Sequence, residues 1–113
     1  MLEHLNVQRQ VHNQSLQPTV LIFQLPQVRE VSLVAMPDPV FGEKACACVV
    51  VQPGAALTFD DLIAHLRAQQ IASFKLPERL EIMESFPISP AGKILKRELR
   101  EIVAQRLALE QNS

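Results

Sequence analysis

The chain contains 113 residues, of which 48% are hydrophobic and 4% aromatic, and its formal net charge is −1. This length suits one domain with a single packed core. The balanced charge and the few aromatic rings argue against nucleic-acid binding, which uses a basic surface or base-stacking side chains. The longest apolar run, residues 45–51, is too short to cross a membrane, and no secretory signal opens the chain. We therefore expect a cytoplasmic protein that binds neither nucleic acid nor membrane.

The N-terminal segment, residues 1–25, has no clear hydrophobic periodicity. Residues 1–18 are rich in Gln, Asn and His, which is typical of a poorly ordered tail or a frayed helix. Residues 19–23 are apolar and β-branched, but this run is too short to be classified by its pattern.

Two strands are predicted next, over residues 28–36 and 43–52. Both faces of the first are apolar, so we expect it to be central in a sheet. A turn-rich loop begins at Pro37, and its short length favours an antiparallel return into the second strand. Cys46 and Cys48 lie two residues apart on that strand and therefore point to one face. Neighbours this close rarely form a disulfide, so we expect buried free thiols. No further His or Cys lies near enough to complete a metal site.

A helix is predicted to begin after the Pro53–Gly54 turn. Thr58 and Asp61 have the spacing of a capping box, in which each side chain accepts from the other residue's backbone N–H. The residues at helical spacing that form its apolar stripe are Phe59, Leu62, Ile63 and Leu66. His65 lies beside this stripe, and we interpret it as a partly exposed surface residue rather than a catalyst.

The third strand is predicted over residues 79–84, with Leu80 and Ile82 on one side and charged residues that indicate a more exposed, edge position. The last helix is predicted over residues 96–109. Its buried stripe consists of Leu95, Leu99, Ile102 and Val103. The order of elements predicts an α+β fold, with a small three-stranded, mainly antiparallel sheet packed against helices.

The segment Pro87–Lys96 carries the clearest chemical signal. Two prolines restrict its backbone, and Gly92 relieves the steric limits on the turn. Lys93 follows directly, so its ammonium would stand at the tip of a stiff loop, where it suits a phosphate or a carboxylate. The alternative interpretation is a solvated loop with an ordinary surface lysine.

Four segments together resemble the C-terminal domain of the AMP-forming acyl and aryl acid ligases, which include acyl-CoA synthetases, adenylation domains of nonribosomal peptide synthetases and luciferases. The segments are Val28–Val31, Pro37–Lys44, Phe74–Glu78 and Pro87–Arg97. Residues 71–76 and 84–87 are most similar to ligases for 2,3-dihydroxybenzoate or salicylate, acids used in siderophore biosynthesis. The resemblance implies that residues 26–113 form the C-terminal lid domain of such a ligase, with residues 1–25 as an unmatched segment.

The resemblance also implies roles for individual residues. In the family, the lysine at the position of Lys93 is catalytic. It reaches a cleft shared with a large N-terminal adenylation domain, which binds ATP and Mg, and contacts the substrate carboxylate and the ATP phosphates. Gly92 would shape the loop at this cofactor-binding site. After rotation of the small domain, Lys44 and Lys75 would contact phosphates of coenzyme A or of a carrier protein's phosphopantetheine.

The chain departs from the family pattern upstream of the first strand. The Gly-rich phosphate loop and the acid pocket are missing, and residues 1–25 do not match the hinge that normally opens this domain. We therefore expect a ligase lid that is inactive without the N-terminal domain. The alternatives are an interaction or oligomerisation module, which would form a homo-oligomer, and the product of a gene fragment without catalysis.

Overall fold

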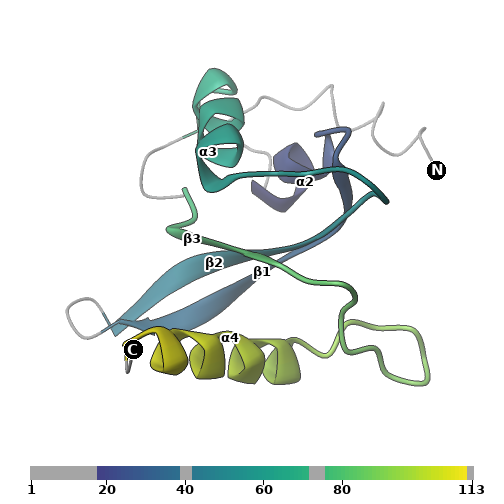
Figure 1. Cartoon of the computed structure of the whole chain (residues 1–113), viewed down its shortest axis with the longest axis vertical. Helices are drawn as coiled ribbons and strands as arrows, with labels where there is room; N and C mark the ends of the chain where they lie inside the picture. Colours follow the sequence, from purple (N-terminus) through teal and green to yellow (C-terminus); the bar gives the residue numbers. More distant parts are fainter. Residues whose placement is uncertain (1–17, 39–41, 72–75, 112–113) are drawn as a thin grey trace.

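The computed structural model describes residues 18–38, 42–71 and 76–111. Its elements are α2 (Pro18–Phe23), β1 (Val28–Asp38), β2 (Gly42–Val51), α3 (Phe59–Ala68), β3 (Arg79–Ile82) and α4 (Lys96–Gln111). The strands form one sheet in the order β1-β2-β3, with β1 antiparallel and β3 parallel to β2. Figure 1 shows α2 and α3 on one face of this sheet and α4 on the other. The predicted α+β class with a small, mainly antiparallel sheet is confirmed.

The position of β1 in the sheet corrects one expectation. We expected this strand to be central because both of its faces are apolar, but β2 is central and β1 lies at an edge. Apolar residues on both faces of a strand indicate that other elements pack above and below it. A central position in the sheet depends instead on hydrogen bonds to two neighbouring strands. The edge position of β3 is confirmed.

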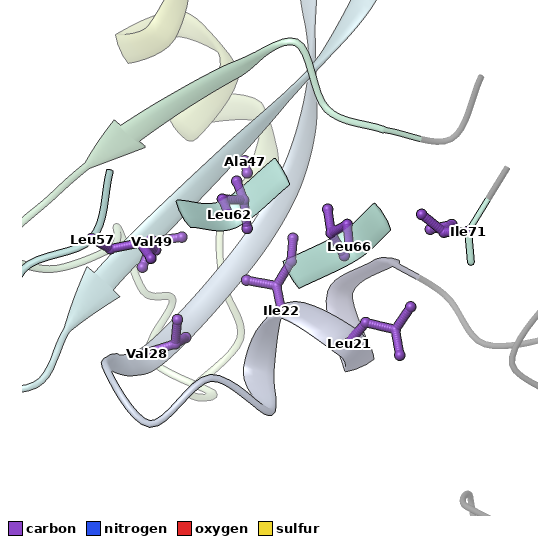
Figure 2. Close-up of a cluster of buried hydrophobic side chains, with 9 residues drawn as sticks. All are labelled: Leu21, Ile22, Val28, Ala47, Val49, Leu57, Leu62, Leu66 and Ile71. Atoms are coloured by element: carbon purple, nitrogen blue, oxygen red, sulfur yellow. The ribbon is translucent and has the colours of Figure 1, made fainter. Parts of the chain in front are cut away.

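The first core cluster lies between the sheet and the helices α2 and α3 (Figure 2). It consists of Leu21, Ile22, Val28, Ala47, Val49, Leu57, Leu62, Leu66 and Ile71. The capping box at Thr58 is confirmed, with 3.1 Å from the Asp61 nitrogen to Thr58 Oγ1 and 3.4 Å for the reciprocal bond. The apolar stripe of α3 is narrower than predicted, because Phe59 in the first turn is 38% exposed.

A histidine joins the two helices of this layer. Nε2 of His65 lies 2.8 Å from the Leu21 carbonyl oxygen, so the ring donates a hydrogen bond across to α2. The side chain is half-buried, in agreement with the partly exposed position expected from the sequence. This contact holds α2 against α3. The short apolar run of residues 19–23, which its sequence pattern left unclassified, therefore belongs to a helix.

The second core cluster lies between the sheet and α4. It consists of Val34, Met36, Cys46, Cys48, Val50, Met83, Phe86, Leu99 and Val103. Both cysteines are buried free thiols, as predicted. A hydrogen bond with Cys48 and burial raise the pKa of the Cys46 thiol, which therefore stays protonated. Leu99 and Val103 are fully buried and anchor α4 to the sheet.

A network of charges joins β3 to the C-terminal half of α4. Glu81 accepts from Arg79 at 2.6 Å and from Arg106 at 2.8 Å. Arg79 also donates two hydrogen bonds to Glu110, at 3.0 and 2.7 Å. The network therefore fixes the far end of the helix that begins just after the Lys93 loop.

The two sides of β3 differ in burial from what the residue types suggest. Ile82 is 41% exposed, whereas the charged Glu81 on the other side of the strand is only 9% exposed. Leu80 on the same side as Ile82 packs against the first core cluster. The opposite side carries Glu81 towards α4, where two arginines compensate its charge.

Candidate functional site

The segment before α4 folds into a tight hairpin. Ile88 and Ile94 form an antiparallel bridge across it. Its backbone hydrogen bonds run from Leu95 N to Pro87 O (2.8 Å), from Ser89 N to Lys93 O (2.9 Å) and from Gly92 N to Ser89 O (2.8 Å). Figure 1 shows this loop projecting beyond the sheet next to the first turn of α4. The stiff loop inferred from the sequence is therefore closed by its own hydrogen bonds.

Lys93 lies on the second arm of this hairpin, where it pairs with Ser89 on the first arm. Its backbone N–H donates to Ser89 Oγ at 3.2 Å, and its carbonyl accepts from the Ser89 N–H at 2.9 Å. The residue is exposed, and it forms no ion pair with any other residue that the structure describes. The backbone is thus held while the ammonium extends into solvent, an arrangement in which a cation is available to an anionic group.

Gly92 adopts a φ of +86°, a region that side chains with a Cβ rarely enter. No atom lies within 4 Å of the place where a Cβ would stand, so the penalty on substitution comes from the backbone and not from a clash. Gly92→Ala is expected to lower the free energy of unfolding by about 1 kcal/mol, and Gly92→Asn by less, because Asn tolerates this conformation better. Urea titration of the two variants measures the difference.

Gly54 offers a matched control for this prediction, since its φ is +78° and it also has free space around it. Gly54→Ala should lose a similar amount of stability while leaving the Lys93 hairpin unchanged. If Gly92→Ala leaves the free energy of unfolding unchanged, the strained conformation of the loop is contradicted.

Lys44 lies at the start of β2, with its Nζ 3.1 Å from Oε1 of Glu78. Both residues line an open groove of about 400 Å³. Its apolar floor is formed by Leu33, Ala35, Ala45 and Leu76. In Figure 1 the start of β2 and the loop before α4 lie on opposite sides of the view. Lys75 falls outside the described residues.

The contribution of Ser89 was missed in the sequence. Its signal was present: a serine within a Pro- and Gly-containing turn often bonds nearby backbone N–H groups through its hydroxyl. Among the described residues, no cluster of three or more His, Cys, Asp or Glu side chains is arranged to hold a metal ion. Within the same ranges, no helix has the length and hydrophobicity needed to cross a membrane.

A family model and two individual proteins each match most of this chain. Residues 21–93 match the family model described as the AMP-binding enzyme C-terminal domain. The chain is 46% identical over 83 residues to a salicylyl-CoA synthase / salicylate adenylyltransferase of Streptomyces sp, covering 74% of this chain and 15% of that protein. It is 37% identical over 82 residues to the 2,3-dihydroxybenzoate-AMP ligase of Bacillus subtilis (strain 168), covering 73% and 15%.

Solved structures share the fold. A Mycobacterium tuberculosis fatty acyl CoA synthetase superposes with a TM-score of 0.73 at 31% identity, over 80% of this chain and 18% of that one. ATP-bound MatB from Rhodopseudomonas palustris gives a TM-score of 0.71 at 29% identity, over 75% and 17%. The chain thus spans about 15% of the length of the two curated relatives.

Proposed function

Because the chain belongs to the AMP-binding enzyme C-terminal domain family, we propose that it is the mobile lid of an ATP-dependent, AMP-forming acid–thiol ligase. The observation that carries the proposal is the closed hairpin that presents Lys93 at the end of the matched region. In this proposal residues 26–113 form the lid, and α2 packs against them through Leu21 and Ile22 in the first core cluster. An aryl acid such as salicylate or 2,3-dihydroxybenzoate is the favoured substrate, by analogy with the two relatives named above.

Lys93 is the catalytic residue in this proposal. Adenylation requires a carboxylate to approach the α-phosphate of ATP, so two anions must meet. An ammonium held beside them offsets this repulsion and stabilises the charge of the transition state. The hairpin fits that task because it fixes the lysine backbone and leaves the charged end exposed. Gly92 contributes the turn that makes this geometry possible.

ATP and Mg would be held mainly by the large N-terminal domain. Among the described residues, no three His, Cys, Asp or Glu side chains are grouped so that they could hold a metal ion. The lid's own contribution to the bound nucleotide is the Lys93 ammonium, which suits a phosphate oxygen.

A second face of the lid would serve the thiol-transfer step. Lys44 and Lys75 would contact phosphates of coenzyme A or of a carrier protein's phosphopantetheine. The start of β2, which carries Lys44, lies on the opposite side of the view in Figure 1 from the Lys93 loop, and this supports a lid that uses two surfaces in turn. The Glu78 carboxylate would hold the Lys44 ammonium until an anionic ligand replaces it.

The lid is expected to be inactive by itself. One exposed lysine does not make a nucleotide pocket, and a lid tethered to its large domain has an effective concentration on the order of mM. Supplied separately at about 1 µM, the same lid would close about a thousandfold less often, unless it binds the large domain on its own.

The test uses the N-terminal domain of an aryl acid ligase without its own lid, joined to this chain by a flexible linker. Acid-dependent exchange of pyrophosphate into ATP should require both parts. Lys93→Ala is expected to lower the exchange rate about 100-fold, the usual loss when one group that stabilises transition-state charge is removed.

Lys96→Ala is the matched control, because Lys96 is also exposed but belongs to the first turn of α4. It should retain most of the activity. Exchange that survives Lys93→Ala at the unmodified rate would rule out the catalytic role.

A further inference from the structure

The hairpin that carries Lys93 contains one hydrogen bond that depends on a side chain. The backbone hydrogen bonds of this hairpin could form with many different side chains in place, since they need only N–H and C=O groups. The bond from the Lys93 N–H to Ser89 Oγ, at 3.2 Å, needs a hydroxyl at position 89. Ser89 therefore holds both polar groups of the Lys93 backbone, the N–H by its side chain and the carbonyl by its own N–H.

The direction in which a side chain leaves the backbone follows from the orientation of its two peptide groups. Gly92 has a φ of +86° and many accessible conformations, so the peptide between Gly92 and Lys93 would rotate easily without a restraint. Ser89 Oγ accepts from the N–H of that same peptide. Ser89 is itself restricted, because Pro90 biases the preceding residue towards extended conformations. The hydroxyl that restrains the Lys93 backbone therefore belongs to a residue whose own backbone is restricted.

We propose that Ser89 is a positioning residue that orients Lys93 for adenylation. This inference rests on the proposed function of Lys93. The hydrogen bond is exposed, so water would replace the hydroxyl as an acceptor in a Ser89→Ala variant and little stability would be lost. Water imposes no fixed direction on the peptide, so the loss should appear in the orientation of Lys93.

The first measurement uses the isolated 113-residue chain and does not depend on activity. Amide hydrogen exchange followed by NMR should show the Lys93 N–H exchanging about 3- to 10-fold faster in Ser89→Ala, as expected for one lost hydrogen bond. Ser89→Thr keeps the hydroxyl and should restore slow exchange. Ser85→Ala lies outside the hairpin and should leave the Lys93 N–H unchanged. Unchanged exchange in Ser89→Ala would overturn the inference.

The second measurement uses the chain joined to a matching N-terminal domain, with pyrophosphate exchange as the readout. Ser89→Ala should lower kcat about 3- to 10-fold with little change in KM for the acid or ATP, and Ser89→Thr should recover the rate. The melting temperature of Ser89→Ala should move by less than about 4 °C. A larger drop in melting temperature, or no rescue by threonine, would indicate a purely structural role and overturn the inference.

The two proposals fail in different ways. If Lys93→Ala lowers exchange of pyrophosphate but Ser89→Ala has the full rate, the positioning role is wrong and the proposed function stands. If Lys93→Ala has no effect, the proposed function fails, and with it the inference for adenylation, whatever the amide exchange shows.

Discussion

Replacing Glu81 with alanine is expected to lower the free energy of unfolding by about 2–4 kcal/mol. The side chain of Glu81 is 11% exposed and lies between Arg79 and Arg106, at 2.6 and 2.8 Å. Removal of one partner from a buried ion pair leaves the other charge uncompensated, which is more harmful than replacing the whole pair. The expected loss is below the upper end for fully buried pairs because Arg106 is 43% exposed and regains water. Urea denaturation monitored by circular dichroism measures it.

Glu110→Gln is the matched control for this prediction. Glu110 also pairs with Arg79, at 2.7 Å, but its side chain is 61% exposed, so water compensates most of the change. The hydrogen bond with Arg79 lowers the pKa of Glu110, so its stabilising contribution is present above the ordinary carboxyl pKa. That contribution is lost as the pH falls through the lowered pKa, and the difference from the unsubstituted chain should vanish in acid. An equal loss in Glu81→Ala and Glu110→Gln at neutral pH would contradict the special position of Glu81.

The network also has a consequence for the candidate site. Glu81, Arg79 and Arg106 fix the C-terminal half of α4 to β3, while the hairpin of Lys93 leads directly into the N-terminal end of the same helix. A helix transmits the position of one end to the other because its backbone hydrogen bonds keep it rigid. We therefore expect contacts at the far end of α4 to influence the orientation of the Lys93 loop relative to the sheet.

Local patterns were sufficient for most of the elements. The capping box at Thr58 marked the start of α3, and the uninterrupted apolar run marked β2 as covered on both faces. Two cysteines two residues apart on a strand were correctly interpreted as buried free thiols. These features are set by neighbours within a few residues in the sequence, so periodicity and capping rules apply to them directly.

The features that the sequence did not reveal depend on partners far away along the chain. Glu81 is buried because Arg106, 25 residues later, packs against it, while the charge of a lone glutamate on a strand predicts exposure. The edge position of β1 depends on which strands pair with β2, and the pattern of the strand faces does not contain this information. The helix α2 has six residues, too few for a periodic signal, and is held by His65 of α3.

The candidate site was predicted in part. Lys93 and Gly92 stood out because the turn residues and the family resemblance coincide there, and the structure shows the closed hairpin that this pattern implies. The sequence did not show that Ser89 bonds the Lys93 backbone, because the hydroxyl orientation depends on how the hairpin closes. The separation of Lys44 from Lys93 likewise emerges only from the arrangement of β2 and α4.

Leu99→Ala is expected to lower the free energy of unfolding by about 3 kcal/mol, through lost burial and the cavity left behind. Leu99 is fully buried in the cluster beneath the sheet, in the first turn of α4. Its backbone N–H bonds to the Leu95 carbonyl at 3.0 Å, so the same residue joins the hairpin to the core. Amide exchange in the hairpin should therefore rise in this variant, even under conditions in which the chain stays folded.

Leu109→Ala makes the same substitution on the same helix at a side chain that is 70% exposed. Its effect on stability should lie within about 0.5 kcal/mol of zero, which removes helix propensity as an explanation of the Leu99 result. If Leu99→Ala lost stability and the hairpin amides kept their slow exchange, the hairpin would be ordered by its own hydrogen bonds alone. If both changed together, the core beneath α4 would share in holding Lys93 in place.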